Sequence, residues 1–260
     1  MNQEKAVKGF TLLELLMAMS IFLVLCAAMF GLLRLSQQKY ANETQLSGSF
    51  QEARLAMDQI VRDVNISGYP AKGLFSVTPT NSSQYTNGAV AWSPGYPNAP
   101  CQPGTAAGGT CLTPSDYDLI LEARLGNDTN VSWIWYHLDG TTLYRAVAPK
   151  NGTDPVGAVS APGLMVPFLT NVMNNPGSAM LAQITAQYPT MFPGGQPQPI
   201  FQYTCDTASG PQACPNAGGN NSTRNIRDVD VTLIVMTLQP DLQTQRLQLV
   251  ELSGRGHRLN

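Results

Sequence analysis

The hydrophobic pattern of the chain begins with one long apolar run. Residues 10–33 contain a single charged side chain, that of Glu14. About 20 consecutive apolar residues are enough for a helix to cross a bilayer, so this run predicts a membrane-spanning helix. An ionised carboxylate in hydrocarbon costs about 2.5 kcal/mol or more. Glu14 is therefore a candidate functional residue that needs a cationic partner.

After Arg34 the sequence contains many polar residues, but its apolar residues still recur with the period of a helix. Apolar side chains recur at alternating steps of four and three, which places them on one face of a helix: Leu46, Phe50, Ala53, Met57, Ile60 and Val64. Gly68 offers a C-terminal cap, and Pro70 prevents continuation. The pattern predicts one helix over residues 10–67, apolar all round at first and amphipathic later, with its stripe packed under a globular domain.

Two stretches in the middle of the chain predict β-strands. In residues 115–124, Tyr117, Leu119 and Leu121 occupy alternate positions and are expected to face inward. Residues 131–138 and 142–147 flank the dipeptide Asp139-Gly140, which is typical of a tight turn. These two segments predict an antiparallel hairpin.

The C-terminal region predicts a second strand pair. Residues 226–238 place alternate valines and leucines on one face, residues 239–241 turn the chain, and residues 245–252 return antiparallel. We expect this pair at the centre of the sheet, packed on the helical stripe. The short basic tail at 254–258 is interpreted as a frayed end or a partner contact.

Two stretches rich in Pro, Gly and Asn separate these elements, residues 71–114 and 148–221. The first is expected to be loop with one short strand. The second is expected to be a long loop region, with a helical stretch at 180–188 and a strand near 201–204, and it is a candidate contact surface. The fold class is therefore α+β: a long N-terminal helix packed on an antiparallel sheet with long loops.

Composition narrows the class of protein. The 260 residues allow one domain of fair size beyond the helix, and a net charge of −2 implies no nucleic-acid partner. Only 12% of residues are charged, while Gly, Pro and other loop-forming residues are abundant. This balance favours an extracytoplasmic, β-rich domain over a cytosolic enzyme.

The five cysteines indicate an oxidising compartment. Cys26 lies inside the apolar run, and the other four form two pairs that are close in sequence, Cys101 with Cys111 and Cys205 with Cys214. Local pairing is the first choice, and the other connectivities that four cysteines permit stay open. A metal site is not favoured, because neither pair has CxxC spacing and the two histidines lie far from both pairs.

No catalytic constellation emerges from the sequence. The chain contains no GxSxG elbow, P-loop, HExxH or dinucleotide fingerprint. His137 stands beside Trp135 in a predicted strand, where packing is the usual role, and Asp116 and Asp118 lack a third group for acid–base chemistry. We expect no enzymatic activity, no cofactor and no metal.

A short basic leader precedes the apolar run. Lys5 and Lys8 would keep the N-terminus in the cytoplasm by the positive-inside rule, which directs everything after Arg34 outward. A secretory signal has a shorter apolar region followed by a small-residue cleavage site, whereas here the small residue, Gly9, comes first. An ordinary signal anchor with a stray Glu14 is the alternative reading.

Residues 9–14, Gly-Phe-Thr-Leu-Leu-Glu, resemble the prepilin processing site of type IV pilins and type II secretion pseudopilins. The resemblance implies that a prepilin peptidase cleaves after Gly9 and N-methylates Phe10. It also implies that Glu14 attracts the terminal amine of a neighbouring subunit, a pairing that low dielectric strengthens. The implied organisation is a type IV pilin-like fold with a leader at 1–9, a helix at 10–68 and an extracytoplasmic β-rich domain at 69–260. Of that helix, residues 10–33 would be transmembrane or filament core, and residues 34–68 amphipathic.

A second resemblance concerns residues 51–70, where a helix ending in arginine and acid runs into Ser-Gly-Tyr. This stretch is similar to one in PilW-like minor pilins, and residues 138–145 resemble a strand pair of the same proteins. The implied role is a minor pilin that primes or caps a type IV pilus together with the major pilin and other minor pilins. It would start in the inner membrane as a single-pass protein with a periplasmic C-terminal domain and move to the pilus at the cell surface. Two alternatives stay open: a J-type pseudopilin of type II secretion, and a membrane-tethered adhesin or binding domain.

Overall fold

The computed structural model describes residues 11–91, 115–152, 154–207, 209–214, 226–237, 240–241 and 246–258. The chain divides into two units, Met1–Leu46 and Ser47–Asn260. The predicted processing residues Gly9 and Phe10 lie outside the described residues. So do Cys101 and Cys111, for which we predicted a disulfide.

Helix α1 spans Leu12–Ile66, a run of 55 residues that belongs to both units. Its end agrees with the sequence, because Gly68 adopts a φ of 82°, a left-handed conformation that glycine reaches without strain. The Gly68 N–H then donates to the carbonyl of Glu122 at 2.8 Å. The predicted long helix is therefore present.

The first sheet contains four antiparallel strands in the order β1-β2-β3-β4: β1 Asp118–Arg124, β2 Val131–Asp139, β3 Thr142–Pro149 and β4 Val166–Leu169. The hairpin predicted at Asp139-Gly140 joins β2 to β3, with Gly140 at a φ of 58°. The predicted first strand is β1, and its Leu119 and Leu121 are buried in the main core. Short 3-10 turns, Lys72–Leu74 and Ser82–Gln84, precede this sheet.

The second sheet is also antiparallel, in the order β6-β5-β7-β8: β5 Phe201–Thr207, β6 Gly210–Cys214, β7 Ile226–Met236 and β8 Leu249–His257. The segment that follows β4 in the chain connects the two sheets through hydrogen bonds to β7. There the Met173 N–H donates to the carbonyl of Ile234 at 2.7 Å, and the Asn174 side chain bonds to backbone groups of Thr232 and Ile234.

Four expectations from the sequence are wrong in whole or in part. There are two sheets where one was expected, and β8 lies at an end of the strand order, not at its centre. The basic tail is no frayed end, since β8 continues to His257. The region at 148–221, expected to be mostly loop, also contains β4, β6, helix α2 (Pro155–Val159) and a 3-10 turn at Pro193–Gly195. The helix predicted at 180–188 and the strand predicted near 201–204 are present, as α3 (Ser178–Gln187) and β5.

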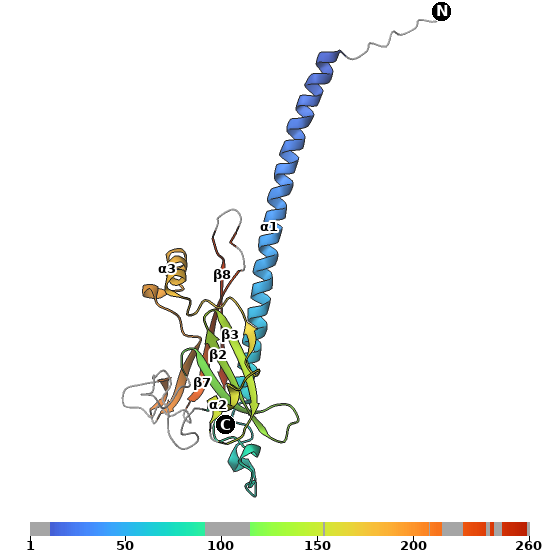
Figure 1. The fold of residues 1–260 in the computed structure, drawn as a ribbon. Coiled ribbons are helices and arrows are strands. Elements are labelled where there is room, and N and C mark those ends of the chain that lie inside the picture. Colours follow the sequence, from blue (N-terminus) through green and yellow to red (C-terminus); the bar gives the residue numbers. More distant parts are fainter. Residues whose placement is uncertain are drawn as a thin grey trace, which may run out of the picture. The chain divides into compact units, whose positions relative to one another are not determined.

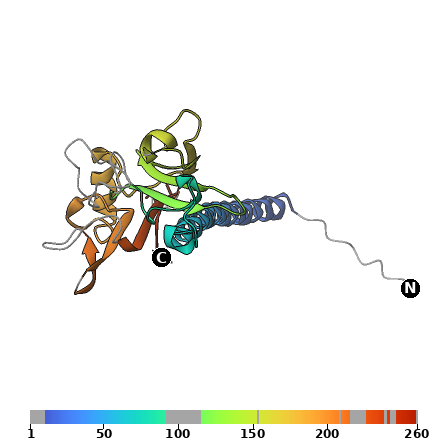
Figure 2. The same ribbon diagram turned by 90° about the horizontal axis from the view of Figure 1, so that it is seen from below.

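The helical stripe lies in the main core together with side chains of both sheets. Ala53, Met57, Ile60 and Val64 are buried there, joined by Ala56. Figures 1 and 2 show strands of both sheets around the C-terminal end of α1. The stripe is shorter than expected: Leu46 is only half-buried and Phe50 is 39% exposed.

Two smaller clusters lie on the outer faces of the sheets. Trp133 of β2 packs with Val159 of α2, and Ile184 of α3 packs with Ile234 of β7. Buried side chains thus lie on both faces of each sheet, which explains why most positions of β1 and β7 are buried.

Candidate functional site

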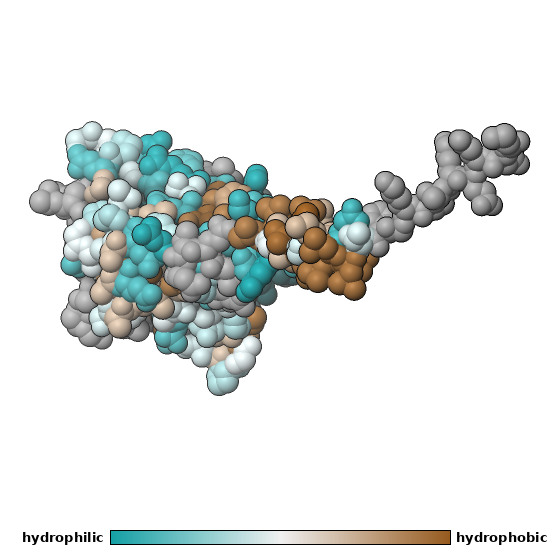
Figure 3. Space-filling model, turned by 90° about the horizontal axis from the view of Figure 1, so that it is seen from above, coloured by the Kyte–Doolittle hydropathy of each residue, from teal (hydrophilic) through white to brown (hydrophobic). Residues whose placement is uncertain are grey.

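The first part of α1 is an exposed apolar surface. Leu12, Leu16, Phe22 and Phe30 are each at least 60% exposed in the isolated chain, and residues 15–33 carry no charge. Figure 3 shows hydrophobic residues gathered along this part of the helix. By length and composition α1 is able to cross a membrane. A surface of this kind needs a cover of lipid or protein.

Glu14 and Thr11 form a capping box at the start of α1. The Thr11 Oγ1 accepts from the Glu14 N–H at 3.3 Å, and Glu14 Oε2 accepts from the Thr11 N–H at 2.9 Å and from its hydroxyl at 3.0 Å. Two backbone donors that the helix itself leaves unsatisfied are thereby bonded. Our sequence analysis missed this contact, although the Thr-x-x-Glu spacing is its usual signal.

A buried ion pair fastens the other end of α1 to the first sheet. Asp63 is 1% exposed, and its Oδ2 accepts from the Tyr136 hydroxyl at 2.7 Å and from Arg145 Nη2 at 2.8 Å. Gln59 donates to the other oxygen at 2.7 Å. Burial and the neighbouring charge of Asp63 raise the pKa of Tyr136, so its hydroxyl keeps the proton that it donates.

A second buried pair holds the chain that follows α1. The Lys150 ammonium lies 2.9 Å from Glu122 Oε1, and the two side chains are 1% and 0% exposed. Glu122 also accepts from Trp133 Nε1 at 3.1 Å and from the Asn87 N–H at 2.7 Å, while Lys150 donates to the Tyr85 carbonyl at 2.8 Å. Burial lowers the pKa of Lys150, and the charge of Glu122 opposes that effect.

On its other side the end of α1 lies against β8. A Cβ added to Gly256 would come within 2.5 Å of the Val64 Cβ, and one added to Gly254 within 2.9 Å of the Met57 sulfur. The Asn65 side chain accepts from the His257 N–H at 2.9 Å. The glycines that looked like a flexible tail therefore permit close packing of strand on helix.

The remaining candidates lie within the sheets. The His137 Nδ1 is 2.6 Å from Asp118 Oδ1, and this hydrogen bond raises the pKa of His137. The same oxygen accepts from Trp135 Nε1 at 3.1 Å. The structure joins Cys205 and Cys214 by a disulfide between β5 and β6, as predicted, and Cys26 is a free thiol. Among the described residues, no group of three potential metal ligands comes together.

Residues 5–30 match the family model for the prokaryotic N-terminal methylation motif. No curated protein matches the chain, and no solved structure matches it. The motif implies processing by a prepilin peptidase and pilin partners in general, and with the apolar helix it suggests membrane anchoring. The PilW-like assignment goes beyond what this match covers. The matched motif and the long helix packed on antiparallel sheets together support a type IV pilin-like protein, a pilin or pseudopilin subunit of a type IV pilus or a secretion system.

Proposed function

We propose that this chain is a minor pilin, a subunit that primes or caps the assembly of a type IV pilus. One observation carries the proposal: the methylation motif at residues 5–30 leads into an exposed apolar helix whose far end is built into an α+β unit. One end of such a helix has an exposed apolar surface that needs a cover, and the other end is packed into the core of the α+β unit. Both are required of a subunit that is drawn from lipid into a filament.

In this role the chain acts through assembly and performs no reaction itself. A prepilin peptidase removes residues 1–9 after Gly9 and methylates Phe10. The apolar half of α1 then exchanges lipid contacts for contacts with neighbouring subunits. Glu14 pairs with the terminal amine of a neighbour, a charge-assisted contact that is strong where water is excluded. Before assembly the protein is held in the inner membrane with its C-terminal unit in the periplasm.

The preference for a minor pilin rests on the two segments with PilW-like character. Asp63, in the first segment, pairs with Arg145, in the second, at 2.8 Å. The two resembling stretches thus form one contact in the fold, across 82 residues of sequence. A shared buried contact is stronger support than two separate resemblances.

A pseudopilin of a type II secretion system is the second candidate, because the methylation motif is common to both classes. The two candidates share processing and membrane anchoring and differ in their partners. Recovery with major pilin in sheared pili supports the minor pilin. Recovery only with secretion components, and never in pili, supports the pseudopilin.

The experiment that tests the class is the intact mass and N-terminal sequence of the protein from native membranes, with and without its prepilin peptidase. A chain that begins at methylated Phe10 only when the peptidase is present supports the proposal. A chain that still begins at Met1 in both strains contradicts it, and makes the protein a signal-anchored surface domain.

A further inference from the structure

Within the described residues, three of the four sheet edges are either covered or short. The chain that follows α1 covers β1, through hydrogen bonds from the Gly68 N–H to the Glu122 carbonyl and from the Glu122 N–H to the Ala89 carbonyl. Strands β4 and β6 have only four and five residues, and each contains a proline, Pro167 and Pro211. Covering, shortness and proline are the usual protections of a sheet edge against pairing with another chain.

Strand β8 forms the fourth edge, and it lacks these protections. Its nine residues contain no proline, and they pair with β7 without a bulge from Leu249 opposite Met236 to His257 opposite Asp228. Because β8 stands at an end of the strand order, no strand of the described chain pairs with its other side.

The hydrogen bonds at the two ends of β8 show which residues face the open side. The Thr237 N–H donates to the Gln248 carbonyl, and the Arg258 N–H donates to a carbonyl of β7, so even-numbered residues bond to β7. Successive residues of an antiparallel strand direct their backbone groups to opposite sides. Odd-numbered residues therefore point away from β7, and accordingly the His257 N–H donates to the Asn65 side chain of α1.

Three residues of β8 have backbone N–H and C=O groups on this open side without a partner in the described chain: Glu251, Ser253 and Arg255. All three residues are exposed. Unpaired groups in a row of this kind are the template on which an extended peptide adds a strand to a sheet. The backbone of β8 is thus suited to bind a strand.

The side chains on the solvent face of β8 indicate the charge of such a strand. Arg255 already pairs with Asp230 across β7, whereas Glu251 lies opposite the apolar Ile234. Within the part of the chain that the structure describes, Glu251 takes part in no ion pair. A basic side chain directly opposite Glu251 on an added strand would supply a favourable cross-strand pair.

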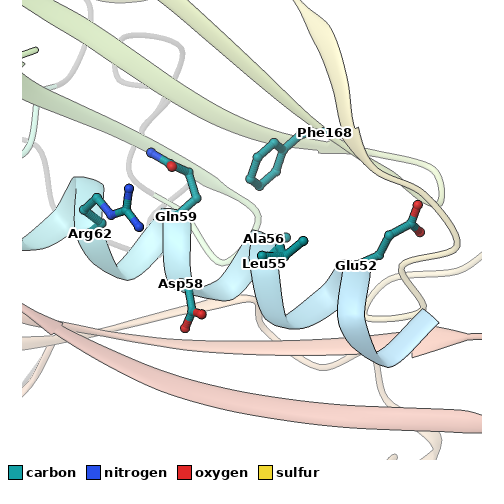
Figure 4. Close-up of a pocket in the computed structure, with 7 residues that line it drawn as sticks. All are labelled: Glu52, Leu55, Ala56, Asp58, Gln59, Arg62 and Phe168. Atoms are coloured by element: carbon teal, nitrogen blue, oxygen red, sulfur yellow. The ribbon is translucent and has the colours of Figure 1, made fainter. Parts of the chain in front are cut away.

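The other face of β8 lies against α1. Figure 4 shows Phe168 of β4 over Leu55 on one side of α1 and strands of the second sheet on the other side, where Gly256 of β8 approaches the helix. On this side Leu252 of β8 and Val61 of α1 pack against the main core but are only partly buried. Apolar side chains on the same face of an added strand would extend the cover of these two residues.

We infer that the open edge of β8 binds an extended segment of a different subunit of the same assembly. The segment adds a strand to the four of the second sheet, with a lysine or arginine opposite Glu251 and apolar side chains on the face toward α1. The inference rests on the proposed function and adds the kind of partner. Each copy has one such edge, which is sufficient for a subunit that primes or caps a filament with other subunits.

A second copy of this chain fits the edge less well. Strand β8 runs in the same direction as α1, because Gly254 approaches Met57 and Gly256 approaches Val64. Antiparallel pairing of two β8 strands would therefore direct their α1 helices in opposite directions. Two chains anchored in the same membrane with one orientation cannot adopt that arrangement.

Photo-cross-linking of the full-length chain in cells that assemble the filament tests the partner. The probe is p-benzoylphenylalanine in place of Ser253. After irradiation we expect an adduct with a different subunit, and peptide mass analysis should place the link in an extended segment that contains lysine or arginine. The matched control carries the probe in place of Ala213, which is exposed on the proline-containing edge strand β6, and should give no such adduct.

A proline substitution tests whether the contact uses the backbone. Ser253→Pro removes an N–H that the described chain does not use, and proline is tolerated at such positions of edge strands. The variant should keep its urea midpoint but lose the partner that co-purifies with the tagged chain. Ser253→Ala retains the N–H and should keep both. Glu251→Lys, an exposed substitution, tests the charge separately and should also reduce the co-purified partner.

The remaining outcomes contradict the inference in distinguishable ways. Strand pairing is overturned if folded Ser253→Pro retains as much partner as Ser253→Ala, and the basic partner residue is overturned if Glu251→Lys retains it. An adduct only with a second copy overturns the occupant, and equal adducts from Ser253 and Ala213 overturn β8 as the site. Processed chain in filaments without any adduct overturns the inference and leaves the proposed function standing, whereas absence of processed chain from filaments overturns the proposed function itself.

Discussion

At the scale of single residues, Glu14 has an observed role in capping α1 and a proposed role in pairing with a neighbouring subunit. In the structure its carboxylate bonds to Thr11 in a capping box, and in the proposed filament it pairs with the amine of a neighbour. Glutamine at this position can still cap the helix, whereas it cannot supply charge. Threonine at position 11 can be changed without removing the carboxylate. These two positions therefore distinguish capping from pairing.

We predict that Glu14→Gln is inserted and processed normally but is recovered in filaments about tenfold less, since a charge-assisted hydrogen bond contributes at least about 1.5 kcal/mol. The measurement is quantitative immunoblotting of membrane and sheared-filament fractions, with intact mass to confirm processing. Thr11→Val is the matched control and should be recovered in filaments nearly as well as wild type. If Thr11→Val is lost from filaments and Glu14→Gln is not, capping is the role that matters.

Lys150 offers a second test at this scale, because its ammonium and the Glu122 carboxylate are buried together. We predict that Lys150→Met lowers the free energy of unfolding by about 3–5 kcal/mol, as an unpaired buried carboxylate is left behind. Adding Glu122→Gln should recover much of that loss. Urea unfolding of the full chain in detergent, followed through the fluorescence of buried Trp133, gives these values.

An exposed pair provides the control for Lys150. Arg255 bonds to Asp230 on β8 and β7, and its side chain is 61% exposed. Arg255→Ala should leave the unfolding midpoint nearly unchanged, because water screens such pairs. Equal losses in Arg255→Ala and Lys150→Met would show that burial is not what makes the Lys150 pair important.

At the scale of elements, the sequence predicted those helices and strands whose residue pattern is local. The helical stripe and the Asp139-Gly140 hairpin are specified by residues close together in the chain, and both are present. Strand β4 was not predicted, because its four residues contain a proline and have no alternation. The Asp63–Arg145 pair was also missed, since it joins positions 82 residues apart that no local rule connects.

Strand β8 shows why glycine was misread. Gly254 and Gly256 reduce strand propensity and looked like a flexible end. Both positions require glycine because Met57 and Val64 of α1 lie so close to the β8 backbone that no side chain fits there. This requirement arises only when α1 packs on β8, so the sequence of neither segment reveals it.

We predict that Gly256→Ala destabilises the protein by about 1–3 kcal/mol, the usual cost of overpacking, because its Cβ would lie 2.5 Å from that of Val64. Unfolding midpoints of the full chain in urea measure the effect. Gly73→Ala is the matched control, since an added Cβ there meets nothing within 4 Å. Matching midpoints for the two variants would mean that β8 moves away from α1 without penalty.

At the scale of the whole molecule, the chain combines a helix that needs an outside cover with a unit that has its own core. The second unit, Ser47–Asn260, contains both sheets and the five α1 side chains that are buried in the main core. The sequence indicated the helix and its stripe, but not that two sheets share them. The number of sheets depends on how strands far apart in sequence pair, which alternation along one strand does not determine.

We predict that a chain beginning at Ser47 folds alone, whereas one beginning at Gln59 does not. The first keeps every α1 side chain of the main core, while the second lacks Ala53, Ala56 and Met57. Loss of a buried methionine side chain alone costs about 2–5 kcal/mol, a large part of the roughly 5–15 kcal/mol that stabilises a typical protein. Both chains should be secreted to an oxidising compartment so that Cys205 and Cys214 can pair.

Near-UV circular dichroism and urea unfolding distinguish the two truncated chains. The chain from Ser47 should show a near-UV signal and one cooperative transition, and the chain from Gln59 should lack both. Cooperative unfolding of both chains would mean that the sheets hold each other without the stripe. In that case the two sheets would form a stable domain without the α1 stripe. The mechanical link between α1 and that domain in a filament would then consist of polar contacts, chiefly the ion pair of Asp63 with Arg145.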